Sequence, residues 1–341
     1  MAEKQWTPRD LFSLFSSNWQ ACVIQAAVKL DLFTVLDDAA DGSANVADLA
    51  KNLNADARAL DMFVTALVSM GYLNRDGASV SLTADSRRYL SARSAEYYGF
   101  MVKHSANILP AWTKLDEAVR TGCRTAEESS SESDNEEKLE SFLMAMFNVA
   151  CQQADLVAET IDLSNRRRLL DLGGGPGTYA IKFCQKYPNL TATVFDQPTT
   201  AKFARATAER FGLTERVDFV GGHFINDPLP GGYDAAWLSQ VLHGEAHIDA
   251  ARLVAAGAKA LSPGGLLCIQ EFIIDDDRRG PAYSALFSLN MLVQTEGGQA
   301  YTEKEITEMM MAAGITDIKR LDIQLPPGCG IITGLKDGPG V

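Results

Sequence analysis

"LLDLGGGPGTYA", residues 169–180, is the stretch that decides the fold. An apolar, strand-like run containing Asp171 leads into a series of glycines and then into a helix-like sequence. Gly173, Gly175 and Gly177 allow a tight turn and a close approach to a ligand, because no Cβ atom stands in the way. The helix that follows would offer free backbone N–H groups at its start. The stretch therefore predicts a ligand-binding turn after the first strand of an α/β sheet.

The glycine pattern fits two classes of ligand. Gly175, Gly177 and Ala180 form G-x-G-x-x-A, a dinucleotide fingerprint. Read from Asp171, the pattern is D-x-G-x-G-x-G, and a carboxylate there would repel a pyrophosphate but suit an ammonium group. Asp196 closes the next predicted strand and could accept hydrogen bonds from a ribose diol. We therefore predict S-adenosylmethionine, which has a ribose, an ammonium group and no phosphate, as the cofactor. An NAD-dependent oxidoreductase (a dehydrogenase) is the alternative.

Short apolar runs alternate with helix-like segments from this stretch to the end of the chain. This alternation predicts a mostly parallel sheet with helices on both faces. The last two runs, 316–324 and 330–336, are too close in sequence for a parallel crossover and predict an antiparallel hairpin. We expect residues 161–341 to form an α/β catalytic domain with a seven-stranded, Rossmann-like sheet.

The first part of the chain, residues 1–120, has the apolar spacing of helices. Within it, residues 43–90 predict two short helices followed by a small hairpin around Asp76-Gly77, which is the pattern of a winged helix. Residues 41–95 contain six acids and six bases, and the helix that would read DNA is mostly apolar. We therefore expect an all-helical winged-helix dimerisation domain rather than a DNA-binding module.

The segment 121–160 is expected to link the two domains. Its acidic, Ser-rich stretch 126–137 predicts a solvated loop, and residues 138–161 predict a helix. The formal net charge of the chain is −13 and no basic stripe is present, which disfavours a nucleic-acid partner.

Other features of the composition concern compartment and cofactors. None of the six cysteines forms a CxxC pair, which is typical of reduced thiols in a cytosolic protein. The N-terminal sequence does not resemble a signal peptide, and no apolar run approaches the ~18–20 residues of a membrane span. We expect a cytoplasmic protein that does not contact membranes.

The motifs together resemble a known family. "LLDLGGGPGTYA", "ATVFDQP", "RVDFVGGHF", "WLSQVLHGE" and "LNMLVQTEGGQAYTEKE" occur in the order and spacing of class I S-adenosylmethionine-dependent O-methyltransferases. The chain is similar to the two-domain caffeate and acetylserotonin type, with its bacterial hydroxyneurosporene relatives, over nearly its whole length. The resemblance implies a homodimer and a small hydroxylated acceptor, such as an aromatic or polyene secondary metabolite. It leaves open whether the acceptor atom is O, N or S.

The resemblance also implies a set of cofactor-binding residues: Asp171, Gly173, Gly175, Gly177, Asp196, Gln197, Gly222, His223, Phe224 and Ser239. The chain departs from the family pattern at several of its functional positions. His223 stands where an Asp usually contacts the adenine amino group, and Ser239 where plant members have a Lys. Gly244 replaces the Asp after the base, and Ala300 replaces a second orienting Glu. These departures keep a non-methylating regulator with a vestigial cofactor domain as an alternative.

His243 follows the fourth predicted strand, at the sheet edge where open α/β folds bind ligands. Methyl transfer to a hydroxyl requires removal of its proton, and an imidazole is a suitable base. The resemblance identifies His243 as the general base and Glu271 as the acid that orients it. His243 and His247 could instead share a metal, but Gly244 favours a loop and no third ligand is evident, so we predict no metal.

The resemblance implies an apolar acceptor pocket lined by Phe142, Met146, Met291 and Thr295. Aromatic and Met side chains suit a flat ring. Ordinary packing between helices is an equally simple interpretation of each of these four positions.

Overall fold

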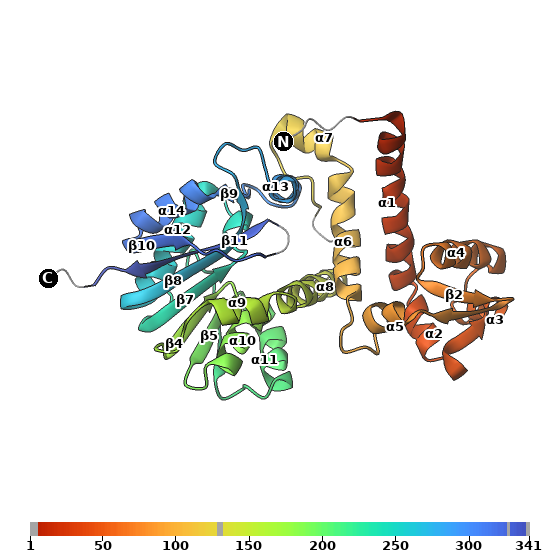
Figure 1. Ribbon diagram of the computed structural model, residues 1–341, viewed down its shortest axis with the longest axis horizontal. Helices are drawn as coiled ribbons and strands as arrows, with labels where there is room; N and C mark the ends of the chain where they lie inside the picture. The colour runs from red at the N-terminus through yellow and green to blue at the C-terminus, as the bar shows by residue number, and fades with distance from the viewer. Residues whose placement is uncertain (1–5, 128–131, 326–327, 339–341) are drawn as a thin grey trace. The chain divides into compact units, whose positions relative to one another are not determined.

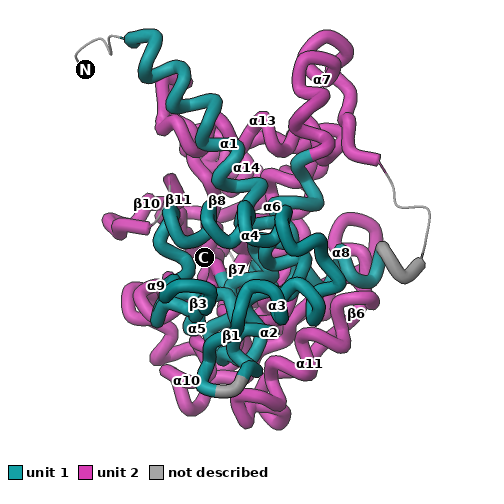
Figure 2. The backbone as a smooth tube through the Cα atoms, turned by 90° about the vertical axis from the view of Figure 1, so that its right-hand side faces the viewer, with its two compact units in different colours: residues 1–109, 132–148 teal, residues 110–131, 149–341 magenta. Residues whose placement is uncertain are grey.

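The computed structural model describes residues 6–127, 132–325 and 328–338 (Figure 1). The chain forms two compact units, one of residues 1–109 and 132–148 and the other of residues 110–131 and 149–341 (Figure 2). Two helices, α6 (Gly99–Trp112) and α8 (Glu132–Cys151), pass from one unit into the other. The linker predicted at 121–160 is therefore shared between the units.

The N-terminal unit combines short helices with a three-stranded antiparallel sheet of order β1-β3-β2. The predicted hairpin is present as β2 and β3, so the winged-helix pattern is confirmed. The term all-helical is wrong, because the hairpin strands β2 and β3 form a sheet together with a third strand of three residues, β1. The elements are α1 (Pro8–Lys29), α2 (Leu32–Asp37), η1 (Ala40–Gly42), β1 (Ser43–Asn45), α3 (Val46–Asn52), α4 (Ala57–Ser69), β2 (Leu73–Asp76), β3 (Ser79–Leu82) and α5 (Ala84–Leu90).

The segment between the domains differs from the prediction. Helix α8 begins at Glu132, inside the expected loop 126–137, of which residues 128–131 lie outside the described part of the chain. Acidic residues are favourable at a helix N-terminus, so an acid-rich sequence fits a helix start as well as a loop. The predicted helix 138–161 is interrupted by a turn at Gln152 and Gln153, and α9 (Ala154–Thr160) follows. Before α8 lies α7 (Leu115–Thr121).

The C-terminal unit contains the predicted sheet, in the order β10-β11-β8-β7-β4-β5-β6. Strands β8, β7, β4, β5 and β6 are parallel, and β11 runs antiparallel to both β8 and β10. The seven strands and the closing hairpin are therefore confirmed, and a two-residue strand, β9, adds to β8. The elements are β4 (Arg168–Leu172), α10 (Thr178–Lys186), β5 (Thr191–Asp196), η2 (Pro198–Thr200), α11 (Ala201–Arg210), β6 (Val217–Gly221), β7 (Tyr233–Ser239), η3 (Leu242–Gly244), α12 (His247–Ala260), β8 (Leu261–Ile274), α13 (Ala282–Gln294), β9 (Tyr301–Thr302), α14 (Glu303–Ala312), β10 (Ile315–Arg320) and β11 (Cys329–Lys336).

Helices cover both faces of this sheet (Figure 1). Apolar side chains of α9, α10 and α11 pack on one face, around the buried Trp237, and those of α12 and α14 pack on the other. Burial on both faces explains why β4 and β7 are almost continuously apolar. The carboxyl ends of β4, β5 and β7 meet at one edge, which brings together the loops that carry Asp171, Asp196 and His243.

Candidate functional site

The turn after β4 requires glycine at three positions. Gly173, Gly175 and Gly177 all have positive φ, at 71°, 53° and 76°. A Cβ atom on Gly173 would lie 2.3 Å from Cγ1 of Val241, and one on Gly174 would lie 2.5 Å from Cγ of Asp171. The backbone of this turn therefore lies directly against the strand-end carboxylate and the loop after β7.

Asp171 is almost fully buried beside this turn. Its Oδ2 accepts a hydrogen bond from the backbone N–H of Ala180, at 3.2 Å. Within the described part of the chain, Oδ1 has no hydrogen-bond partner. Burial, with a smaller contribution from the charge of Asp196, raises the pKa of Asp171 to about 7. A buried carboxylate with an unpaired oxygen fits a ligand that carries an ammonium group.

Asp196, at the end of β5, organises the neighbouring loops. Its Oδ2 accepts from the N–H of Gly175 at 2.8 Å, and its Oδ1 accepts from the N–H of Gln197 at 2.6 Å and from the Thr200 hydroxyl. Its carbonyl accepts from the N–H of Gly222 at 2.9 Å. Burial raises the pKa of its carboxyl group. Oδ2 can accept one further donor, as binding of a ribose hydroxyl would require.

The remaining predicted cofactor residues follow β6 and end β7. The N–H of His223 donates to Oδ2 of Asp227 at 2.8 Å, and its Nδ1 accepts from the N–H of Ile225 at 3.4 Å. Phe224 packs against the core on the α12 face of the sheet. Ser239 interacts through its hydroxyl with Oε1 of Gln270, at 3.5 Å. Ten predicted positions thus lie on loops or strand ends of one sheet edge.

His243 and Glu271 form a direct contact. Nδ1 of His243 lies 2.7 Å from Oε2 of Glu271. The other carboxylate oxygen accepts from the N–H groups of Leu242 and His243, at 2.8 and 3.3 Å, and the N–H of Phe272 donates to Oε2. The carboxylate therefore fixes both the imidazole ring and the short η3 turn that carries it.

An aromatic cluster beside His243 was not predicted from the sequence. The Phe287 ring lies edge-on to the imidazole, with centroids 4.7 Å apart, and it contacts Phe272 at 4.2 Å. Tyr283 extends this cluster from α13. Phe287 and Tyr283 lie on one face of α13, yet no local pattern in the sequence points that face toward His243.

The four predicted acceptor-pocket residues are divided between the two units. Phe142 and Met146 lie on the part of α8 that belongs to the N-terminal unit, where the Phe142 ring contacts His104. Met291 and Thr295 lie in the C-terminal unit. The Thr295 hydroxyl donates to the Met291 carbonyl at 2.9 Å and accepts from the N–H of Gly298 at 2.8 Å. The Thr295 hydroxyl therefore links the end of α13 to the loop at Gly298.

Sequence comparison identifies the family. Residues 112–316 match an O-methyltransferase domain, and residues 12–93 match an O-methyltransferase dimerisation domain. The chain belongs to the O-methyltransferase family. This confirms the family and the enzyme class predicted from the sequence.

Relatives of this O-methyltransferase cover almost its whole length. A 3-hydroxy-5-methyl-1-naphthoate 3-O-methyltransferase from Streptomyces sahachiroi is 32% identical over 96% of this chain and 95% of its own. The tetracenomycin polyketide synthesis 8-O-methyl transferase TcmO from Streptomyces glaucescens is 32% identical over 94% of both chains. The solved structure of PigF with SAH has a TM-score of 0.87 at 28% identity, and covers 97% of this chain and 100% of its own. Human N-acetylserotonin methyltransferase with SAM has a TM-score of 0.85 at 29% identity, and covers 99% of both chains.

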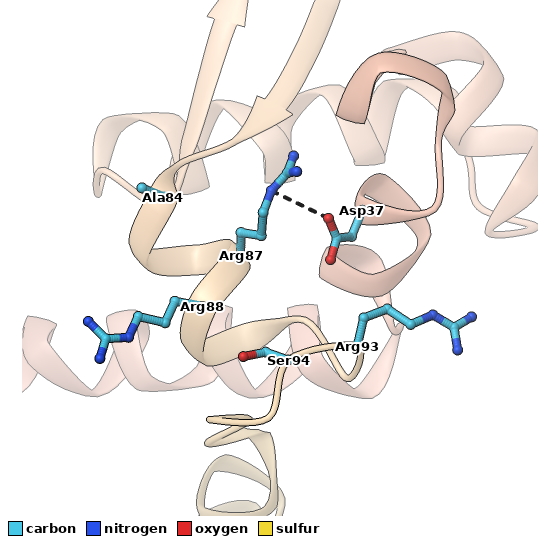
Figure 3. Close-up of a pocket in the computed structure, with 6 residues that line it drawn as sticks. All are labelled: Asp37, Ala84, Arg87, Arg88, Arg93 and Ser94. Carbon is cyan, nitrogen blue, oxygen red and sulfur yellow. Dashed lines mark ion pairs between the residues drawn. The ribbon is translucent and has the colours of Figure 1, made fainter.

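A pocket of about 410 Å³ lies in the N-terminal unit of this O-methyltransferase (Figure 3). Its three arginines are each matched by a carboxylate: Arg87 by Asp37, Arg88 by Glu96 and Arg93 by Asp38. Figure 3 shows Arg87 turned toward Asp37, whereas Arg88 and Arg93 point outward in opposite directions. The charges do not converge on a common point, as an anion site would require.

Within residues 6–127, 132–325 and 328–338, no group of three or more His, Cys, Asp or Glu side chains is arranged to hold a metal ion. No helix in them is both long and apolar enough to cross a bilayer.

Proposed function

We propose that this O-methyltransferase moves the methyl group of S-adenosylmethionine to a hydroxyl group of a small aromatic secondary metabolite, with His243 as the general base. The observation that carries the proposal is the 2.7 Å contact between Nδ1 of His243 and the buried carboxylate of Glu271. A base held by an orienting acid, at the sheet edge that binds ligands, is the arrangement that proton abstraction needs.

The residues at the ends of β4 and β5 would hold the cofactor. Asp171 would receive the ammonium group, because its Oδ1 is buried and unpaired within the described residues. Asp196 would accept from the ribose, and the glycine turn at Gly173–Gly177 would allow the cofactor to approach the backbone. The bound cofactor supplies an electrophilic methyl group on a sulfonium sulfur.

His243 would remove the acceptor's proton. The Glu271 carboxylate accepts a hydrogen bond from Nδ1–H, which leaves the lone pair on Nε2 to take the hydroxyl proton. The oxygen would then be free to bond to the methyl carbon that the cofactor supplies, with the electrons of the carbon–sulfur bond left on sulfur. The carboxylate of Glu271 would stabilise the imidazolium that forms. It is a positioning residue, since it acts through His243.

The surroundings of His243 support an aromatic acceptor. Phe272, Phe287 and Tyr283 form an aromatic wall next to the imidazole. Such rings bind a flat acceptor by stacking or edge-on contact. The two Streptomyces relatives are named for a hydroxynaphthoate and a tetracenomycin polyketide, so a fused-ring phenol is the acceptor class that we propose. Met291 and Thr295, which lie in the same unit, would complete its pocket.

The dimerisation domain supports a homodimer. Helix α1 carries large apolar side chains that are exposed in a single chain, among them Phe12 at 67% and Phe15 at 69%. Patches of this kind mark protein–protein interfaces. We propose that α1 of a second copy covers them. Phe12→Asp with Phe15→Asp should convert the dimer to a monomer in light-scattering measurements, and an unchanged mass would exclude this surface.

The proposed function can be tested with the purified chain, S-adenosylmethionine and a panel of hydroxynaphthoates. Product mass should increase by one methyl group, and thermal-shift screening should show stabilisation by S-adenosylhomocysteine but not by NAD. Stabilisation by NAD alone would favour the dehydrogenase alternative. Cofactor binding without methylation of any phenol or related nucleophile would favour the non-methylating regulator.

A further inference from the structure

The loop that carries His243 is supported from two sides. Glu271 holds it from the β8 side, as described above. The second support is the segment 295–301, which packs behind the backbone of residues 243–246. This segment includes Ala300, the position where the family resemblance led us to expect a second orienting acid.

We propose that Gly298 and Tyr301 are positioning elements that hold the backbone of the His243 loop, next to Ala300, where this chain has no second acid. The proposal rests on the proposed function, because it presumes that His243 is the base. It assigns the second support of the base to a backbone contact and a tyrosine hydroxyl instead of a carboxylate.

Gly298 is in contact with the base's own peptide group. A Cβ atom added at Gly298 would lie 2.4 Å from the carbonyl oxygen of His243 and 2.5 Å from the Thr295 hydroxyl. The next residue back, Gly297, would place a Cβ atom 2.7 Å from that of Ala246. Distances under about 3 Å cannot be tolerated without movement. The two glycines therefore fit closely against the backbone of the His243 loop.

Tyr301 ties the other end of the loop. Its hydroxyl donates to the carbonyl oxygen of Glu245 at 2.6 Å, and its ring is 1% exposed. Burial raises its pKa to about 12, so the hydroxyl stays protonated and remains a donor throughout the working pH range.

The two supports share one strand. Tyr301 lies in β9, where it pairs with Ile273 of β8, and Ile273 is two residues after Glu271. The carboxylate that holds the imidazole and the hydroxyl that holds its loop are thus fixed to the same short piece of β8. This gives His243 a rigid position without a second acid, since strand pairing restricts both supports.

Tyr301→Phe is the direct test, because it removes the hydroxyl and keeps the ring. We expect kcat with S-adenosylmethionine and a hydroxynaphthoate to fall by about 3- to 10-fold, the usual effect of one lost hydrogen bond. The KM for the donor should change less than twofold, which separates positioning from general damage. The matched control is Tyr187→Phe, whose hydroxyl also donates to a carbonyl, that of Ile161, at 2.6 Å, but lies at the C-terminal end of α10. It should lower the melting temperature without lowering kcat.

Gly298→Ala gives a second, independent test. It should lower kcat more than Tyr301→Phe while binding of S-adenosylhomocysteine, measured by calorimetry, stays within twofold. Gly231→Ala is its control, because a Cβ atom there meets nothing within 4 Å. A wild-type kcat in either folded variant would overturn the proposal. His243→Ala is measured in parallel: if it keeps the wild-type rate, the proposed base is wrong, whereas loss of activity only in His243→Ala would refute the positioning role alone.

Discussion

Two regions of the molecule join a carboxylate to a nitrogen at the same distance, 2.7 Å. In the N-terminal unit, Arg93 pairs with Asp38, and their side chains are 66% and 48% exposed. In the C-terminal unit, His243 pairs with Glu271, and their side chains are 14% and 2% exposed. The distance alone does not distinguish the two contacts, but the surroundings of each pair do.

In the exposed pair, both carboxylate oxygens of Asp38 accept hydrogen bonds from Arg93. Arg93 donates two hydrogen bonds to Asp38, which holds the pKa of Asp38 below its usual range. Water screens this pair, so it contributes little. Glu271, by contrast, accepts from three backbone N–H groups as well as from His243, and it leaves Nε2 of the imidazole available. Burial and an imidazole nitrogen that Glu271 does not use distinguish this pair from the exposed one, as a general base held by an acid would require.

The largest effect is expected for His243→Ala. This variant removes the proposed base, so kcat at pH 7 should fall by about 10²–10⁴-fold. Binding of S-adenosylhomocysteine should change little in calorimetry, because the predicted cofactor residues lie on other loops. An unchanged kcat would show that another group takes the proton.

Glu271→Gln should have a smaller effect on kcat, about 10- to 10³-fold. The amide can still accept from the N–H of Leu242, but it cannot stabilise an imidazolium at Nδ1. The rate with a hydroxynaphthoate is the measurement, with circular dichroism to confirm folding. If circular dichroism showed that the variant is unfolded, Glu271 would be assigned a role in stability instead.

Asp171→Asn should act on cofactor affinity and on its pH dependence. The pKa of Asp171 is raised to about 7, so a proton competes with the cofactor's ammonium group below that pH. In the wild type, affinity for S-adenosylhomocysteine should fall by up to about tenfold per pH unit between pH 7 and 5, and it should be nearly constant above pH 7.

Asp171→Asn should also change how the free energy of unfolding depends on pH. Because the folded pKa of Asp171 is above its unfolded value of about 4, the contribution of this group to the free energy of unfolding is fully present below pH ~4 and is lost as the pH rises to 7. Asp171→Asn should remove this trend from the ligand-free protein and bind the cofactor weakly at every pH. If the affinity of the variant for S-adenosylhomocysteine kept the wild-type pH dependence, the assignment of Asp171 to the ammonium group would be wrong.

The smallest effect is expected for the exposed pair of Arg93 and Asp38. Arg93→Ala should lower the free energy of unfolding only slightly, because water screens the exposed pair, and it should leave kcat unchanged. Urea denaturation and the same methyl-transfer assay measure both quantities. A large loss of activity would mean that the N-terminal unit acts on the site through this pair.

The sequence predicted the parts of the site that follow from strand order. Asp171, Asp196 and His243 each end or follow an apolar run, and parallel strands bring their carboxyl ends to one edge. The Phe287 contact could not be predicted, because the rotation of α13 about its axis depends on packing with distant residues. The bond from Tyr301 to the Glu245 carbonyl joins residues 56 positions apart and leaves no local pattern.

Two errors in the predicted fold, at β1 and at the start of α8, have local causes. Strand β1 has only three residues, which is too short to show an alternating pattern. The start of α8 at Glu132 was missed because acidic residues are common both in solvated loops and at helix starts.

The role of His243 as general base is tested most directly by the single-turnover rate of His243→Ala between pH 7 and 10. The rate is measured with saturating S-adenosylmethionine and a hydroxynaphthoate. A phenol ionises near pH ~10, so hydroxide can replace the missing base as the pH rises. The variant should be slow at pH 7 and its rate should increase about tenfold per pH unit, while the wild-type enzyme keeps most of its rate at pH 7. A variant that is as fast as wild type at pH 7, or equally slow at every pH, would contradict His243 as the general base.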